Sequence, residues 1–233
     1  MTPIARQSCK VEPLSPILRH LQSLKHQPNS PPTLEIENAL FQHGFRSVCG
    51  IDEAGRGAFA GPLVAASVIL GKQGIGGLDD SKRLSKKTRE QLYLEITKKA
   101  ASYSVAVIDV DFINRLGIQV ASYKAYRQTV EALKNRPDFV LLDYYEIPDF
   151  NVMQFGLKFG DRISQSIAAA SIVAKVCRDK IMGQLSHDKR YKLFGFETHK
   201  GYGTLLHRKA IKKYGLSDQH RVKYCQTCID STN

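Results

Sequence analysis

The sequence predicts a mixed β-sheet flanked by helices, which is an α/β or α+β fold. Short runs rich in β-branched residues are spread along the chain, and helical patterns separate the later ones. The first two runs have only a loop between them, which does not fit a regular doubly wound sheet. The chain has 233 residues, of which 42% are hydrophobic, so it is long enough for one domain with a substantial core.

The chain begins with a proline-rich stretch, residues 1–33, which we expect to be an N-terminal extension. Within it, Pro16–His26 can hold a short helix. The next segment, Leu34–Phe45, has a helical pattern that packs Leu34, Leu40 and Phe41 inward.

The loop between the first two predicted strands carries an unusual set of residues. Asp52 and Glu53 directly follow the apolar run Ser47–Ile51, and Gly55-Arg56-Gly57 precedes the second run, Leu63–Leu70. Neighbouring side chains of a strand point to opposite faces. Asp52 and Glu53 should therefore straddle the end of the first strand, unless the loop turns both toward one site.

The remaining elements follow from periodicity and from capping residues. Ser85 is a suitable N-cap for the helix that follows it, and Gly117 is expected to interrupt a long helical segment. The predicted elements are a helix to about Ala100, a strand over Tyr103–Val110, helical structure over Asp111–Leu133, strands over Phe139–Leu142 and Val152–Leu157, a helix over Arg162–Leu185, and a final helix that ends near Tyr214.

Charge and cysteine usage narrow the function class. Lys plus Arg number 34 against 22 for Asp plus Glu, which favours nucleic acid as a partner, then an anionic membrane surface, while charge that only aids solubility stays open. No apolar stretch is long enough to span a membrane and no secretory signal is expected. The five cysteines include Cys225 and Cys228 in a polar tail, without the second pair that a zinc site needs. We expect a cytoplasmic protein.

Four carboxylates are candidates for one metal site. Asp52 and Glu53 follow the first strand, Asp143 follows a buried strand, and Asp161 opens a helix. If these two strands are neighbours, their ends lie about 5 Å apart. Gathered carboxylates repel one another unless divalent cations separate them, and oxygen ligands favour Mg²⁺ or Mn²⁺. Such a site can hydrolyse a phosphodiester.

Each acid also has a structural interpretation. Asp161 on its own is best explained as a helix cap, and Asp143 as a turn residue. We interpret Asp79 and Asp80 as solvated loop residues; Glu146 and Asp149 are expected at the surface. The Gly-Arg-Gly sequence has two interpretations as well: a turn between strands, or a loop whose backbone N–H groups approach a phosphate or sugar. Its spacing fits neither a dinucleotide-binding loop nor a P-loop.

Four sequence blocks, in this order, resemble bacterial ribonuclease HII. They are Gly50-Ile51-Asp52-Glu53-Ala54-Gly55-Arg56-Gly57 with Gly61-Pro62, then Asp80-Ser81-Lys82, then Ala168-Ala169-Ala170-Ser171-Ile172-Val173-Ala174-Lys175, and finally His199-Lys200-Gly201-Tyr202-Gly203-Thr204. The resemblance spans roughly Leu34–Tyr214 and leaves the extension and the tail outside.

The resemblance implies a ribonuclease H-like α/β fold, with a mixed five-stranded sheet and a helical C-terminal region. It implies a catalytic domain over residues 34–233, with a substrate-binding part from about residue 186. It further implies an endoribonuclease that uses Mn²⁺ or Mg²⁺, cuts the RNA strand of RNA/DNA hybrids, and nicks duplex DNA 5′ to an embedded ribonucleotide, leaving a 3′-hydroxyl and a 5′-phosphate. A monomer without membrane attachment is expected.

The resemblance also implies the site residues. The catalytic, metal-binding acids are Asp52, Glu53, Asp143 and Asp161, and the residues that read the ribose are Gly55, Arg56, Gly57 and Tyr202. Lys82 and Lys175 are candidate phosphate contacts, although Lys175 can instead pair with Asp179 four residues on. His199 can relay protons, but a surface-loop histidine is the favoured interpretation. The alternatives are a ribonuclease HIII, a DNA nuclease of the same fold, and a nucleic-acid-binding protein without catalysis.

Overall fold

The computed structural model describes residue 21 and residues 30–229. The short helix predicted over Pro16–His26 lies outside these residues, apart from Leu21, which is buried against Ile36 and Leu40 in one of the apolar clusters. No helix in the described part of the chain is long and apolar enough to cross a membrane.

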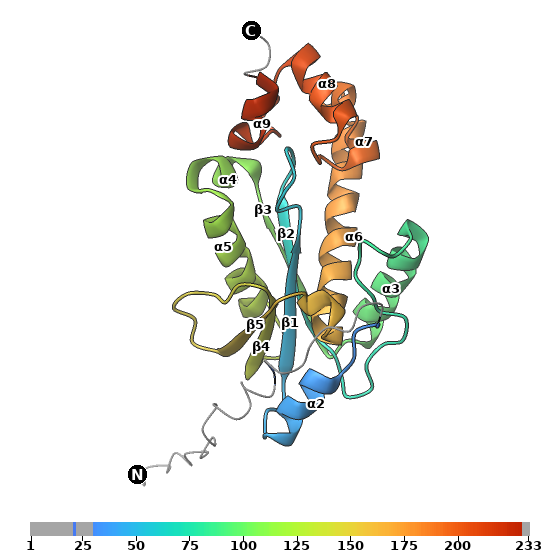
Figure 1. The fold of residues 1–233 in the computed structure, drawn as a ribbon, viewed down its shortest axis with the longest axis vertical. Helices are drawn as coiled ribbons and strands as arrows, with labels where there is room; N and C mark the ends of the chain where they lie inside the picture. The colour runs from blue at the N-terminus through green and yellow to red at the C-terminus, as the bar shows by residue number, and fades with distance from the viewer. Residues whose placement is uncertain (1–20, 22–29, 230–233) are drawn as a thin grey trace.

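One mixed sheet forms the centre of the molecule (Figure 1), as predicted. Its strands are β1 (Val48–Ala54), β2 (Leu63–Ile69), β3 (Ser102–Ile108), β4 (Phe139–Asp143) and β5 (Met153–Leu157), in the order β3-β2-β1-β4-β5. β2 is antiparallel to β1 and β3, whereas β4 is parallel to β1 and β5. Because Ile51 is paired with Leu142, the next residues along the two strands, Asp52 and Asp143, lie at the same edge.

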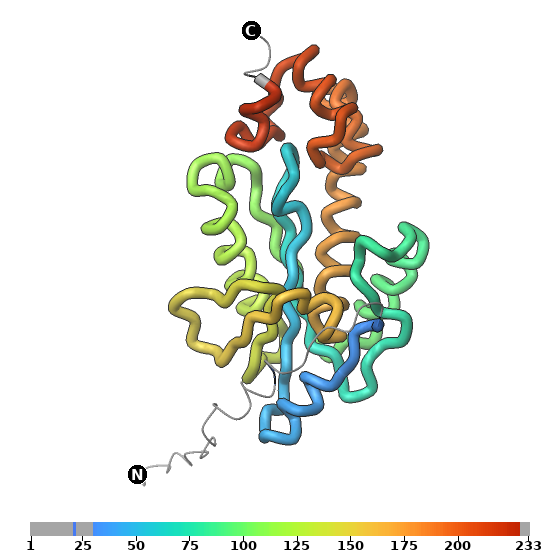
Figure 2. Tube along the Cα trace, in the orientation of Figure 1, coloured from blue at the N-terminus to red at the C-terminus, as the bar shows by residue number. Residues whose placement is uncertain are grey.

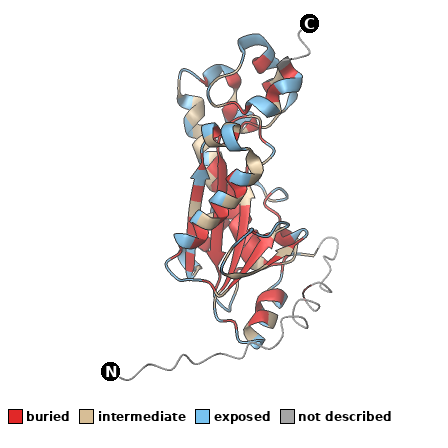
Figure 3. Ribbon diagram, turned by 90° about the vertical axis from the view of Figure 1, so that its left-hand side faces the viewer, coloured by how far each residue is buried: buried red, intermediate tan, exposed pale blue. Residues whose placement is uncertain are grey.

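Helices cover both faces of the sheet (Figure 1). The helices are α2 (Glu35–Gln42), α3 (Lys86–Lys99), α4 (Val110–Leu116), α5 (Ile118–Glu131), α6 (Gln165–His187), α7 (Phe196–His199), α8 (Leu205–Tyr214) and α9 (Val222–Ile229), with short 3-10 turns η1 (Gly160–Arg162) and η2 (Lys192–Phe194). α5 packs with α4 against one face, and α6 packs with α3 against the other. The buried residues concentrate on the sheet and on the helix sides that face it (Figure 3).

Small residues allow α6 to approach β1 closely. A Cβ on Gly50 would lie 2.1 Å from the backbone carbonyl carbon of Ser166, so no other residue fits there without moving the helix. Ala168, Ala169 and Ala170 are fully buried on the same stretch of α6. This approach is what brings side chains of α6 next to the acidic end of β1.

The structure confirms some predicted helix limits and corrects others. Ser85 caps α3, accepting from the N–H of Thr88 at 3.1 Å, and Gly117 separates α4 from α5 at φ +84°. The cap interpretation of Asp161 is wrong, because the Ser164 side chain caps α6. β1 continues through Ala54, so the two acids lie within the strand rather than after it.

The C-terminal region is folded further than the sequence predicts. α9 follows α8, and both cysteines of the expected polar tail are buried in it as free thiols: Cys225 is 0% exposed and Cys228 is 2% exposed. The red part of the tube in Figure 2 gathers at one end of the molecule, next to the turn between β1 and β2. Backbone hydrogen bonds join the two, from the N–H of Arg221 to the oxygen of Phe59 at 2.7 Å and from the N–H of Gly61 to the oxygen of Gln219 at 2.8 Å.

Candidate active site

A pocket of about 560 Å³ gathers most of the residues singled out in the sequence. Its lining comes from β1, from the loop that follows it, from the end of β4, from the loop before α3, and from α6. The lining residues are Asp52, Glu53, Ala54, Gly55, Arg56, Gly57, Ser81, Lys82, Arg89, Asp143, Ser171, Lys175 and Tyr202. Asp161 is not in this lining, but it is 5% exposed and close enough to Asp52 and Asp143 to interact with them electrostatically.

The two acids of β1 point to opposite faces of the sheet, as strand alternation predicts. Asp52 is on the α6 side, where the Ser171 hydroxyl favours its ionised form. Glu53 is on the α5 side and accepts a hydrogen bond from the hydroxyl of Tyr126. The backbone N–H of Glu53 donates to Asp52 Oδ1 at 2.7 Å, and both side chains line the same pocket.

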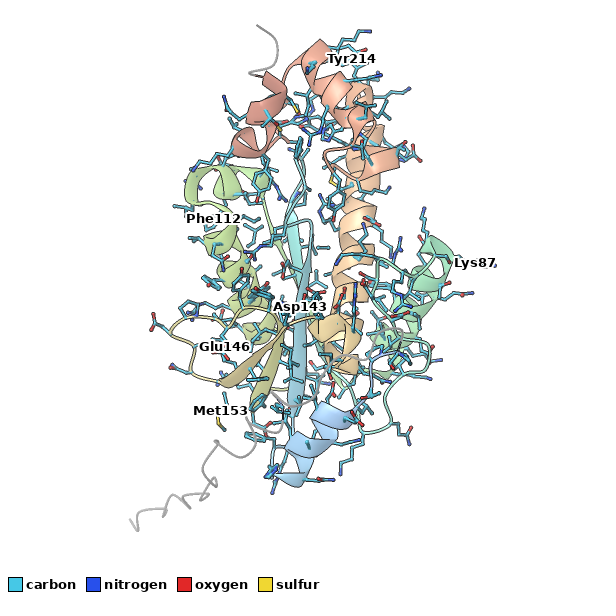
Figure 4. The ribbon with its side chains drawn as sticks, viewed as in Figure 1. Lys87, Phe112, Asp143, Glu146, Met153 and Tyr214 are labelled. Carbon is cyan, nitrogen blue, oxygen red and sulfur yellow. The ribbon has the colours of Figure 1, made fainter. Side chains whose placement is uncertain are left out.

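Asp143, at the end of β4, and Asp161, in η1, complete the group of four acids. Asp143 Oδ1 accepts from the N–H of Gly160 at 2.8 Å, which ties the end of β4 to η1 and so to Asp161. In Figure 4, Asp143 lies near the middle of the molecule, whereas Glu146 lies on the outer loop that follows β4. Glu146 and Asp149 are exposed, as predicted.

Burial and mutual repulsion disfavour the ionised form of these acids, and a bound cation would stabilise it. Burial raises the pKa of Asp52 well above its usual range, and the charges of Glu53 and Asp143 raise it further. Burial, then Asp143, raises the pKa of Asp161 to about 6. Burial also raises the pKa of Glu53 and that of Asp143.

The donor set fits divalent cations such as Mg²⁺ or Mn²⁺, since four carboxylates supply hard oxygen ligands and gain most from a compensating positive charge. Within residues 21 and 30–229, however, no three Asp, Glu, His or Cys side chains already form a complete metal-binding group. Their oxygens instead accept from Tyr126 and from the N–H groups of Glu53 and Gly160.

Asp80 corrects one sequence prediction. It is not a solvated loop residue but is 1% exposed, and Arg162 pairs with it at 3.0 Å. Its Oδ1 accepts from the N–H of Lys82 at 2.9 Å, which fixes that lysine beside the pocket. Burial lowers the pKa of Lys82, but the attraction of Asp80, Asp161 and the other acids outweighs it and the net pKa is raised. Lys82 therefore remains a cation beside the acids.

The two glycines of the Gly-Arg-Gly sequence differ in backbone conformation and in their surroundings. Gly55 has φ +94°, and a Cβ there would lie 2.0 Å from Nε of the buried Arg178. Gly57 is exposed and has open space around it. Gly55 thus serves the packing of the loop, and Gly57 leaves room over the loop for a bound molecule.

Arg56 is held at the rim of the pocket by α5. Its guanidinium donates to Ser122 Oγ at 3.2 Å and to Gln119 Oε1, and lies 3.8 Å from Glu53 Oε1. It also stacks over the Tyr145 ring at 5.2 Å. The side chain therefore reaches from the loop to the acid, and its position is defined before any ligand binds.

Tyr202 lines the same pocket as the acids, with Lys175 beside it. Lys175 pairs with Asp179 at 2.7 Å, as the alternative interpretation proposed, while its Nζ lies 5.3 Å from the centre of the Tyr202 ring. A second pocket of about 610 Å³ adjoins and shares Arg89, Lys175 and Tyr202 with the first. The linings of the two pockets combine basic residues of α3 and α6, among them Arg89 and Lys175, with several carboxylates.

His199 also differs from the prediction, because it is 7% exposed and not on the surface. Its Nε2 donates to the carbonyl of Phe194 at 2.7 Å and its Nδ1 accepts from the N–H of Gly201. Both ring nitrogens are thus used to hold the loop before Tyr202, and a proton relay to the acids has no support in this geometry.

Sequence reasoning missed three buried residues that hold the site in place: Tyr126, Arg178 and Arg221. Tyr126 is 2% exposed and both arginines are 0% exposed. Arg178 continues the polar side of α6 three residues after Lys175, and that spacing is a usable signal. Arg221 has no local signal, since its partners at Gly55 and Gly61 are 166 and 160 residues away.

Comparison with known proteins agrees with this geometry. A family model described as Ribonuclease HII matches residues 49–227, which extends into α9. A Ribonuclease HII of Caldicellulosiruptor saccharolyticus is 46% identical over 196 residues, covering 84% of this chain and 95% of the relative. The ribonuclease H2 structure of Pyrococcus horikoshii OT3 has a TM-score of 0.66 at 21% identity, covering 81% of this chain and 100% of that one. A Bst-RNase HIII solved in complex with Mn²⁺ has a TM-score of 0.59 at 19% identity, covering 90% and 75%.

Proposed function

The chain belongs to the ribonuclease HII family and is a ribonuclease H-type endonuclease, and from this premise we propose its substrates and mechanism. It hydrolyses the RNA strand of RNA/DNA hybrids and cuts duplex DNA 5′ to an embedded ribonucleotide, leaving a 3′-hydroxyl and a 5′-phosphate.

The observation that carries this proposal is the composition of the pocket that holds the acids. One pocket is lined both by the acids Asp52, Glu53 and Asp143 and by the Gly55–Gly57 loop and Tyr202. The acids supply the chemistry of phosphodiester cleavage, and the loop and the ring supply contacts to a sugar. A nuclease without ribose selectivity would need only the first group.

Asp52, Glu53, Asp143 and Asp161 would hold divalent cations, Mg²⁺ or Mn²⁺, which activate a water molecule and stabilise the leaving oxygen of a phosphodiester when bound. The mutual repulsion of the four carboxylates and their raised pKa values support this assignment. Tyr126 orients Glu53 through its hydroxyl, and Ser171 favours the charged form of Asp52.

Selection for ribose rests on the loop. The 2′-hydroxyl is the group that distinguishes a ribonucleotide from a deoxyribonucleotide at one site. The exposed, open Gly57 lets the backbone approach it, and Arg56 adds a positive charge for the neighbouring phosphate. Lys82 and Lys175 contribute phosphate contacts that do not depend on sequence.

Tyr202 selects the nucleotide that follows. A ring packed against the next sugar disfavours a 2′-hydroxyl there sterically and so favours an RNA–DNA junction. Tyr202 belongs to the helical part of the chain from about residue 186, which we assign to substrate binding within a catalytic domain over residues 34–233. Residues 1–33 are assigned to an extension, and we expect the protein to act as a monomer.

One assay tests the proposal. The substrates are a DNA duplex with a single ribonucleotide, an RNA/DNA hybrid, an all-DNA duplex and an all-RNA duplex, each with Mg²⁺ or Mn²⁺ and with EDTA. We expect cation-dependent cleavage of the first two, with products that end in a 3′-hydroxyl. Cleavage of the all-DNA duplex at the same rate would refute the ribose assignment, and binding without cleavage would point to a nucleic-acid-binding role instead. Cleavage of the hybrid but not of the single-ribonucleotide duplex would favour a ribonuclease HIII-like activity.

A further inference from the structure

Two adjacent residues of the loop between α8 and α9 connect the two parts of the site that read the sugar. We propose that His220 and Arg221 are positioning residues: Arg221 orients the Gly55–Gly57 loop, His220 acts on Tyr202 through His207, and together they set the selectivity for an RNA–DNA junction. This inference rests on the proposed function, because it assumes that the loop and Tyr202 contact the substrate.

The Arg221 guanidinium donates hydrogen bonds to carbonyl oxygens of the loop. Its Nη1 donates to the oxygens of Gly55 at 2.7 Å and Arg56 at 3.0 Å, and its Nη2 donates to the oxygen of Gly61 at 2.8 Å. The side chain is 0% exposed and forms no salt bridge with a carboxylate in the described part of the chain. Burial and the nearby Arg178 lower the pKa of Arg221 to about 10, so the guanidinium still carries its charge at neutral pH.

These hydrogen bonds of Arg221 determine where the loop N–H groups point. The described residues contain no cis peptide bond, and in a trans peptide the carbonyl and the N–H of one plane point in opposite directions. Since the oxygens of Gly55 and Arg56 point at Arg221, the N–H groups of Arg56 and Gly57 point away from it. Neither N–H donates to any acceptor within residues 30–229, and both residues line the pocket. Arg221 thereby keeps two adjacent donors available for the substrate.

His220 reaches Tyr202 through a chain of neutral imidazoles. His207 Nδ1 lies 3.0 Å from the carbonyl oxygen of Tyr202, which can only accept, so Nδ1 carries the proton. His207 Nε2 must then accept from His220 Nε2 at 3.1 Å, and His220 Nδ1 accepts from the N–H of Ser217 at 2.9 Å. The donor and acceptor roles are consistent along this chain, with His220 Nδ1 also 2.8 Å from Ser217 Oγ, and both rings are buried. The backbone of Tyr202 is therefore held by a fixed donor.

Arg178 closes the arrangement from α6. It donates to the oxygens of Ala60 at 3.0 Å, Pro62 at 3.0 Å and Lys200 at 2.9 Å, so it spans the same two segments from the opposite side. A β-bridge between Ala58 and Tyr202 joins them directly. The loop and the tyrosine are thus joined in one unit, in which Arg221 bonds to the loop and the adjacent His220 reaches Tyr202 through His207.

The test uses variants of the full chain that keep some contacts and remove others. Arg221→Lys keeps the charge but loses the forked donor. His220→Asn keeps an acceptor for Ser217 but loses the donor to His207, whereas His220→Gln places an amide donor near His207. Arg127→Lys is the matched control, since Arg127 also donates to two backbone carbonyls, those of Pro148 and Asp149, away from the pocket.

The measurements are kcat and KM on the single-ribonucleotide duplex and on a continuous RNA/DNA hybrid, with thermal unfolding of each protein. Arg221→Lys should lower kcat/KM on both substrates by on the order of 10- to 100-fold, the scale of a small misplacement of contact groups. His220→Asn should move the ratio of kcat/KM for the two substrates toward one, His220→Gln should restore it, and Arg127→Lys should match the parent. A purely structural role would lower the melting temperature and the active fraction but leave KM and the ratio unchanged.

Three results of these measurements would count against the inference or against the proposed function. Parent-like KM and ratios in folded Arg221→Lys and His220→Asn proteins overturn the inference. If the Arg221→Lys protein does not fold, the His220→Asn and His220→Gln proteins provide the test. The same ratio of kcat/KM for the two substrates in both of these variants refutes the proposal. A parent chain that cuts neither substrate refutes the proposed function itself, which is a different result from variants that behave like an active parent.

Discussion

The two glycines of the Gly-Arg-Gly loop provide a matched pair of substitutions with opposite expected effects. Gly55→Ala places a methyl group 2.0 Å from Nε of Arg178 at a φ of +94°, whereas Gly57→Ala meets nothing within 4 Å. The same chemical change is therefore made two residues apart. Only one of the two sites is packed against the protein.

The cost at Gly55 has two parts. A non-glycine residue at positive φ costs about 1–2 kcal/mol. Displacing Arg178 removes a buried cation from three carbonyl oxygens, those of Ala60, Pro62 and Lys200, and disturbing a buried charge in this way costs about 3–5 kcal/mol. We expect Gly55→Ala to lower the free energy of unfolding by about 4 kcal/mol or more, which for a chain of this size lowers Tm by about 10 °C.

At Gly57 the stability should change by less than about 0.5 kcal/mol, because the site is open and has an ordinary φ. The methyl group there instead occupies the space over the loop N–H groups, so cleavage of the single-ribonucleotide duplex should fall at least about tenfold. Urea unfolding and steady-state kinetics of both variants test this. Equal losses of stability, or a fully active Gly57→Ala protein, would refute the assignment of separate roles to the two glycines.

Three further predictions follow from the acids and the buried rings. Asp143→Asn should abolish cleavage while hybrid affinity, measured with Ca²⁺ by fluorescence anisotropy, changes by less than about threefold, since basic residues supply most of the binding; retained turnover in Mg²⁺ contradicts the metal assignment. Tyr126→Phe, an isosteric change, removes the donor to Glu53 and should raise the Mg²⁺ concentration needed for half-maximal activity several-fold; an unchanged Mg²⁺ titration contradicts it. Burial lowers the pKa of His207 to about 4, below its unfolded value of about 6.5, so its contribution to stability is present above pH 6.5 and is lost as the pH falls toward 4. The free energy of unfolding of the parent should therefore fall relative to that of His207→Gln in this window, by at most about 1.4 kcal/mol per pH unit, and parallel curves from urea titrations would show that His207 is not held neutral.

Local pattern predicted the parts of the fold that local physics controls. Strand alternation placed Asp52 and Glu53 on opposite faces, and both the cap at Ser85 and the break at Gly117 follow from single-residue preferences. The sheet order could not be derived from local pattern, but the assumption that β1 and β4 are neighbours, which brought Asp143 near Asp52, is confirmed, and the two strands are parallel.

Partners distant in the chain controlled what the sequence did not predict. Asp80 is polar and lies among polar neighbours, so nothing local indicates that Arg162, 82 residues later, covers it. His199 differs, because its partners are local: it ends α7, contacts Phe196 of the same helix and stacks on His207 of α8. Pattern reasoning detects which side of an element is apolar, but it does not detect polar groups that are buried because a remote partner satisfies them.

The buried arginines explain how a site so rich in acids can also attract a phosphodiester. Four carboxylates repel a polyanion, and bound cations offset that repulsion only where they bind. Arg178 and Arg221 place two positive charges next to the Gly55–Gly57 loop, where they donate to neutral carbonyls, and neither forms a salt bridge with a carboxylate in residues 30–229. The same bonds turn loop N–H groups toward the pocket, adding partial positive charge at the surface. The charge that binds the substrate and the geometry that reads its sugar therefore arise from the same side chains. Replacing Arg221 with an uncharged residue should then make the salt dependence of substrate binding shallower than the same replacement of Arg127, and an equal salt dependence would separate the two roles.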